Sequence, residues 1–208
     1  MIAAAIAGVL TMMVHPTSHD VLTSGQFQAV AVLGEAVHIF AIIATAFAFL
    51  GALVLARNLD SPDRLAMSAL VIYGFATVAV MIAATLSGLV AIPVLQKMVE
   101  QPQASAQWQG FATYSGLLNQ AFARIYTLLA SIAIALWSVA IVRSRTLPRA
   151  AGIYGLVIAP VIFVAVASGH VRLDVHGFGA VVLLQAIWSI AVGAALYRTR
   201  PVPATSGS

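Results

Sequence analysis

Long uninterrupted apolar runs constrain this chain more than any other feature. Hydrophobic residues make up 62% of the 208 residues and charged residues only 8%, whereas an ordinary soluble domain carries about 25% charged residues. Most runs reach the roughly 20 residues that a helix needs to cross a hydrocarbon core. Because the runs are continuous and not alternating, they favour helices, which satisfy their own backbone in lipid, over a barrel. The sequence predicts an all-α integral membrane protein.

Polar breaks divide residues 1–200 into six expected transmembrane helices that form one bundle and one domain. The first run, Met1–Val14, has the length of a signal-peptide core, but no Lys or Arg precedes it, so we interpret it as a span. Pro160 should kink the fifth span because it removes a backbone donor. A polar connection is expected at 96–109, and a disordered cytoplasmic tail at 201–208. The five later spans are expected at 27–56, 65–94, 110–142, 150–169 and 179–197.

Basic residues gather in the loops at one end of the expected bundle. Only Lys97 and Arg172 are expected at the other end. Short loops rich in Lys and Arg stay cytoplasmic, so both termini are predicted to lie inside a bacterial inner (plasma) membrane. These loops explain the net charge of +4 without nucleic-acid binding. The seven arginines expected on the inner side are Arg57, Arg64, Arg143, Arg145, Arg149, Arg198 and Arg200.

Counting along the expected helices places the isolated polar residues at one depth, near the outer face. A helix rises about 1.5 Å per residue and the hydrocarbon core is about 30 Å thick. His38 and Arg124 each lie 19 residues before an inner arginine, and His170 lies 21 residues after one. The sequence therefore predicts one outer polar layer. Its members are Glu35, Gln120, Arg124, Asp174 and the five histidines His15, His19, His38, His170 and His176.

Two spacings in this layer are typical of metal ligands. Glu35 and His38 are three residues apart and share a helix face, as in carboxylate-bridged metal proteins. A single motif of this kind argues against a di-iron centre. His15 and His19 are four apart, which on a helix places both imidazoles on one side. Pro16 disfavours helix at that point, so two interfacial histidines in a turn are the alternative.

The link Ser168–Gly177 joins the last two expected spans. It holds His170 and His176, with Asp174 as an acceptor that would orient a ligand imidazole. A solvated turn is the alternative interpretation of this link.

Arg124 is the other informative residue of the layer, because a charge at membrane depth needs a partner or water. Glu35 is the expected counter-ion, and Gln120 lies one turn before Arg124 on the same face. The alternative is that Arg124 extends to the outer headgroups.

Three functions fit these observations. The first is a metal or haem site at the outer face, because neutral imidazole is the commonest metal ligand. Haem b or copper would suit redox work there, between a quinol and a periplasmic electron acceptor. The second is a carrier of lipid or apolar solute, since the inner half lacks the ionisable lining of an ion pathway. The third is a non-catalytic subunit or scaffold, in a homo-oligomer or a larger membrane complex.

Some chemistries are disfavoured by what the sequence lacks. With no cysteine, the chain has no disulfide framework, thiolate metal site or thiol nucleophile. It also has no Gly-rich phosphate loop, no Gly-x-Ser-x-Gly elbow and no His-Glu-x-x-His zinc motif. The histidine layer therefore remains the main candidate for chemistry.

Overall fold

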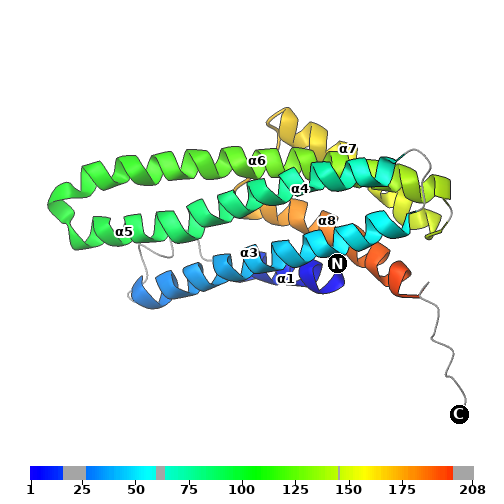
Figure 1. Cartoon of the computed structure of the whole chain (residues 1–208). Coiled ribbons are helices and arrows are strands. Elements are labelled where there is room, and N and C mark those ends of the chain that lie inside the picture. Colours follow the sequence, from blue (N-terminus) through cyan, green and yellow to red (C-terminus); the bar gives the residue numbers. More distant parts are fainter. Residues whose placement is uncertain (16–26, 60–63, 145, 199–208) are drawn as a thin grey trace, which may run out of the picture.

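The computed structural model describes residues 1–15, 27–59, 64–144 and 146–198, and every regular element in these ranges is helical (Figure 1). The predicted all-α bundle is therefore confirmed. The expected ligand His19, Arg145, Arg200 and the tail 201–208 lie outside the described residues. The elements are α1 (Ile2–Met13), α3 (Phe27–Asn58), α4 (Leu65–Ala84), the π-helical η1 (Thr85–Val90), α5 (Ala91–Glu100), the 3₁₀ turn η2 (Pro102–Ala104), α6 (Ser105–Ser144), α7 (Arg149–Ala167) and α8 (Val175–Arg198).

Five helical stretches of the described chain are long and apolar enough to cross a membrane, as a multi-pass protein requires. The first helix, α1, has only 12 residues, so it covers about 18 Å of a core about 30 Å thick. It packs against α3 and α8, and Gly51 and Gly193 of those helices leave room for Met1 and Ile2. The stretches are Phe27–Asn58, Leu65–Glu100, Pro102–Ser144, Arg149–Ala167 and Val175–Arg198.

The basic loops lie at one end of the bundle. Arg57 and Arg143 are in the last turns of α3 and α6, and Arg198 ends α8. Because Met1 lies beside Gly51, six residues before Arg57, the start of α1 is at the same end. The start of α1 and the end of α8 therefore lie at the same end of the bundle, and the assignment of that end to the inner side stays a prediction.

Aromatic side chains fill the centre of the bundle. Trp137 and Trp188 are each 1% exposed, and their rings stack with centroids 6.1 Å apart. The ring of Tyr73 meets Trp137 edge to face at 5.3 Å, and Trp137 Nε1 donates to the carbonyl of Ala66 at 3.0 Å. The two tryptophans are core packing and not membrane-interface anchors. The outward surface is apolar as well, as a lipid-facing surface must be, with Phe47, Phe75, Val157, Val161 and Val164 exposed.

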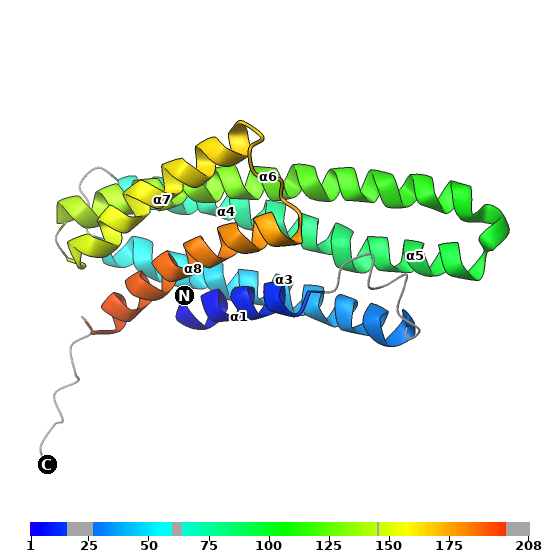
Figure 2. The same ribbon diagram turned by 180° about the vertical axis from the view of Figure 1, so that it is seen from behind.

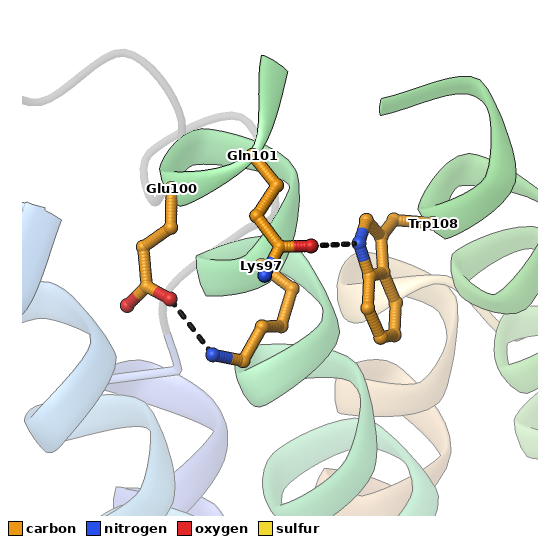
Figure 3. Close-up of polar contacts among 4 residues, drawn as sticks. All are labelled: Lys97, Glu100, Gln101 and Trp108. Carbon is orange, nitrogen blue, oxygen red and sulfur yellow. Dashed lines mark hydrogen bonds and ion pairs between the residues drawn. The ribbon is translucent and has the colours of Figure 1, made fainter. Parts of the chain in front are cut away.

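The α4–α6 hairpin is longer than the rest of the bundle, and α5 and the start of α6 project beyond the other helices (Figures 1 and 2). The expected connection 96–109 is mostly helical, because only Gln101 separates α5 from η2. Trp108 Nε1 donates to Gln101 Oε1 at 3.1 Å across the tip, and Lys97 pairs with Glu100 at 2.9 Å (Figure 3). Both side chains of that ion pair are exposed, so it stabilises the tip little.

The last two helices, α7 and α8, are joined by a tight turn. α7 is one continuous helix across Pro160, and the predicted bend there stays a prediction. Gly169 follows the end of α7 with φ +77°, a left-handed conformation that glycine adopts without strain. The short turn that follows leads directly into α8.

Candidate functional site

His38 is the only one of the described histidines that is buried, with 5% of its surface exposed. Its Nδ1 donates to the carbonyl of Gly34, one turn earlier in α3, at 2.6 Å. A carbonyl only accepts, so Nδ1 carries the proton and Nε2 of the neutral ring presents its lone pair. Proteins commonly orient a metal-ligating imidazole by such a hydrogen bond from the ring nitrogen that does not bind the metal.

His15, just after α1, reaches the free side of this ring. The two Nε2 atoms are 3.0 Å apart, and the rings meet edge to face with centroids 4.7 Å apart. Since His38 Nε2 accepts, His15 Nε2 is the donor. The pair joins the end of α1 to α3, and we call it the His15–His38 pair.

The π-helical segment Thr85–Val90 forms the wall behind His38. A Cβ atom on Gly88 would fall on the Cβ and Cγ atoms of His38, so only glycine allows the two helices this approach. On the other side of the segment, Ser115 of α6 donates to the carbonyl of Leu86 at 3.1 Å. π-helical turns inside α-helices occur frequently at functional sites, and this one is shaped to the imidazole.

The geometry of the His15–His38 pair suits two ligands of one metal ion when His15 takes the tautomer with its proton on Nδ1, which gives both Nε2 atoms a lone pair. Two metal–nitrogen bonds of about 2.05 Å that span 3.0 Å enclose an angle of about 94°. That angle is close to the right angle between neighbouring ligands of a square-planar ion. Haem fits less well, because its macrocycle would have to pass between two rings that are in edge-to-face contact.

The other described histidines do not join this pair. His170 and His176 are exposed, and His170 Nδ1 lies 2.7 Å from the Ser168 hydroxyl oxygen. Within residues 1–15, 27–59, 64–144 and 146–198, no three His, Asp or Glu side chains gather as ligands. The expected outer layer is thus divided, and the described chain brings together two of its five histidines.

Gln120 and Arg124 have a different role from the one expected. Arg124 donates from Nη2 to the carbonyl of Ala167, the last residue of α7, at 2.7 Å. Gln120 Nε2 donates to the carbonyl of Leu173 at 2.8 Å. One face of α6 therefore holds both ends of the α7–α8 turn, with a cation at the negative end of the α7 dipole.

The expected ion pair between Glu35 and Arg124 is not formed. Glu35 is half-buried, and among the described residues the one ion pair joins Lys97 to Glu100. Arg124 is directed to α7, where the exposed Ala167 carbonyl accepts a hydrogen bond from it, so the matching depth of Glu35 and Arg124 does not bring them together.

Asp174 caps α8 and does not orient an imidazole. Its Oδ1 accepts from the backbone N–H of Gly177 at 2.9 Å, as an N-cap carboxylate does. A Cβ on Gly177 would fall on the carbonyl oxygen of Arg172, so glycine is required where the chain enters α8. The link 168–177 is a capped turn whose polar side chains are exposed.

A cavity of about 150 Å³ lies between α1, α3, α4, α6 and α8. It is lined by Gln185, whose Oε1 accepts from the Tyr126 hydroxyl at 2.8 Å. Gln185 Nε2 is buried and has no hydrogen-bond partner within the described chain. We did not expect this site from the sequence, although Gln185 is an isolated polar residue 13 positions before Arg198, near mid-membrane.

Comparison with models of known families, with curated proteins and with solved structures found no match. The function therefore has to be argued from the two sites themselves: the His15–His38 pair between the end of α1 and α3, and the cavity between the helices.

Proposed function

We propose that this multi-pass membrane protein binds a transition-metal ion between His15 and His38, and that the preferred ion is copper. The ion sits at the outer face of a bacterial inner membrane and exchanges electrons with a periplasmic partner. One observation carries the proposal: the 3.0 Å approach of two imidazole Nε2 atoms, one of them oriented by the Gly34 carbonyl.

Copper is favoured by the ligand type and by the angle. Imidazole nitrogens suit Cu, Zn, Ni and Fe, and affinity for divalent ions at a given nitrogen site peaks at Cu²⁺. The angle of about 94° that the pair would subtend favours a square-planar ion over the wider tetrahedral angle of zinc. The sequence contains no cysteine, so a thiolate-bound metal is not in competition.

The surroundings of His38 support a redox role. The ring is 5% exposed and rests against the π-helical segment, so bound metal would lie beside a low-dielectric wall. Such a shell controls solvent access and shifts the reduction potential of a metal. The remaining coordination positions would be taken by water or by His19, which follows His15 after three residues and stays a sequence prediction.

The test is metal binding by the full chain in lipid nanodiscs. Apo protein is titrated with Cu²⁺, bound metal is counted by elemental analysis, and nitrogen ligands are read from the electron paramagnetic resonance spectrum. We expect one tightly bound Cu²⁺ with two imidazole nitrogens or more. His38→Ala and His15→Ala should lose it, while His170→Ala and His176→Ala, which alter exposed histidines, should keep it.

Two controls separate ligand loss from misfolding. His15 follows the last turn of α1 and is only half-buried, so His15→Ala should fold even where His38→Ala does not. Circular dichroism and the Trp137–Trp188 fluorescence report the bundle directly. Equal copper binding by the wild type and by folded His15→Ala would overturn the proposal, as would a wild type that binds none.

A further inference from the structure

The cavity inside the bundle lies deep in the expected membrane. Thr45 is 12 residues before Arg57, Tyr73 is nine after Arg64, and Gln185 is 13 before Arg198, so all three lie near the middle of a 20-residue crossing. Water is scarce at that depth, and a polar group without a partner is unfavourable there. The hydrogen-bonding state of the polar atoms that line the cavity therefore indicates which kind of ligand the cavity can bind.

The hydroxyl groups of the threonines that line the cavity already donate hydrogen bonds within the protein. Thr11, Thr45 and Thr77 donate to carbonyls of their own helices, at 2.7, 2.8 and 2.7 Å. Each hydroxyl oxygen keeps lone pairs, so these residues accept hydrogen bonds and donate none to a ligand.

Two residues that line the cavity have a buried polar atom without a hydrogen-bond partner in the described chain. One is Trp188, whose Nε1 lies next to Gly155 of α7, and the other is Gln185. The amide oxygen of Gln185 accepts from Tyr126, while its nitrogen is buried without a partner. The residue is 6% exposed, so solvent does not complete it. A ligand oxygen that accepts from this amide would complete its hydrogen bonding.

The aromatic side chains that line the cavity favour a flat, apolar ligand. Tyr73, Trp137, Phe178 and Trp188 line it, and stacking between rings is favourable. A volume of about 150 Å³ is that of a known dry protein cavity that takes up benzene. One six-membered ring fits this volume.

We propose that this cavity binds a single-ring ligand of the phenol or quinone type, whose oxygen accepts a hydrogen bond from the Gln185 amide while its ring lies against the aromatic wall. The same chemistry is offered by two sources, the head group of a membrane quinone and a free small phenol. The site is separate from the His15–His38 pair and does not depend on a bound metal.

The short helix α1 gives the site a wall of small residues. Ala4, Ala5 and Gly8 face the cavity from α1, and a Cβ on Gly8 would meet only Val182, at 3.6 Å. A leucine at position 8 therefore has room to begin there and should fill the cavity. Gly116 of α6 has no atom within 4 Å of its Cβ position and serves as the matched control.

The experiment measures binding to metal-free protein in nanodiscs by calorimetry and by the shift in thermal unfolding. The ligands are p-cresol, toluene, which lacks the oxygen, and a decyl-substituted benzoquinone, which carries a tail. The proteins are wild type, Gly8→Leu, Gly116→Leu and Gln185→Met. We expect p-cresol to bind wild type and Gly116→Leu, and Gly8→Leu to lose binding. Gln185→Met should weaken p-cresol about tenfold and leave toluene unchanged.

Each result decides the proposal. Displacement of p-cresol by the decyl quinone identifies a membrane quinone as the source, and binding of p-cresol alone identifies a small free phenol. Equal binding of p-cresol by Gly8→Leu and by wild type would overturn the site. A wild type that binds neither p-cresol nor the quinone would also overturn it, and stabilisation by Gly8→Leu would then show that the cavity is empty. Because all arms lack metal, failure here leaves the copper proposal standing.

Discussion

The end of the bundle away from Arg57, Arg143 and Arg198 carries two pairs of histidines in contrasting surroundings. His38 is buried, and its two ring nitrogens meet the Gly34 carbonyl and His15. His170 and His176 belong to the α7–α8 turn and are exposed, and His170 meets only the hydroxyl of Ser168 two residues away. Both pairs lie about one membrane thickness from the inner arginines.

The two pairs of histidines differ in the direction in which their side chains face and not in their depth along the bundle. The turn with His170 is held by its backbone, through Gln120, Arg124 and the Asp174 cap, so its imidazoles are left to solvent. His38 is held by its side chain, because the π-helical segment provides a surface shaped to the ring. An imidazole becomes part of a site when the fold restrains its ring and not just its backbone.

The largest expected effect on stability comes from a substitution that fills the space occupied by the His38 side chain. Gly88→Ala puts a Cβ on the imidazole, so we expect a loss of about 3 kcal/mol in the free energy of unfolding. Denaturant titration in mixed micelles measures it. Gly116→Ala, with open space around it, should stabilise by about 0.5–1 kcal/mol. If the two changes have the same effect, His38 does not depend on Gly88.

Removing the buried imidazole should have the next largest effect. His38→Ala deletes a buried ring and two hydrogen bonds, for which we expect a loss of about 2 kcal/mol. In the Gly88→Ala background the same change should cost less, because the contacts with Cγ and Nδ1 disappear with the ring and only the Cβ contact remains. Additive losses in this double-mutant cycle would contradict the contact.

The clamp on the other pair can be tested separately. Arg124→Met removes the hydrogen bond to the Ala167 carbonyl, and a loss of about 1 kcal/mol is expected. Hydrogen exchange of backbone amides 168–174 should become faster while α3 is unchanged. Glu35→Gln is the control, and a comparable effect from it would revive the ion pair with Arg124.

The α8 cap should contribute a similar or smaller amount. Asp174→Ala leaves the Gly177 N–H without its side-chain acceptor, which destabilises by about 1 kcal/mol. Asp174→Asn keeps an acceptor oxygen and should recover most of the loss. Thermal unfolding of the two variants measured side by side decides this, and equal losses would show that the cap is not the cause.

His170→Ala should have the smallest effect. The side chain is exposed and its one contact is local, so a change within about 0.5 kcal/mol is expected. Copper binding should also be unchanged. A loss of metal in this variant would join the two histidine pairs into one site and remove the contrast drawn above.

The spans could be predicted from sequence because their causes are local in the chain. Apolar runs and flanking arginines place the starts of α3 and α4 at Phe27 and Leu65 and the ends of α3 and α6 near Arg57 and Arg143. The stretch 96–109 is the expected polar connection, but its helical conformation was not predicted, because polar residues of this kind form a loop or the end of a helix equally well.

The site could be predicted only in part, because depth along a helix says nothing about rotation around it. Residues equally deep, such as Glu35 and Arg124, face different neighbours. The His15–His38 contact depends on where α1 ends, and Gly88 matters only because a neighbouring helix brings His38 to it. Gln185 was visible in sequence as an isolated amide, but its missing partner is a property of packing.

The π-helical segment also fixes the phase of everything that follows it. Each residue of an α-helix turns the chain by about 100°, and a π turn accommodates one additional residue. If the same residues Thr85–Val90 wound as an ordinary α-helix, α5 would be rotated by about that angle, which turns Ile92 and Leu95 out of their buried positions. Deleting one residue in addition would restore the original phase of α5. The π-helical winding at this one place therefore sets the face that the projecting hairpin presents to its surroundings.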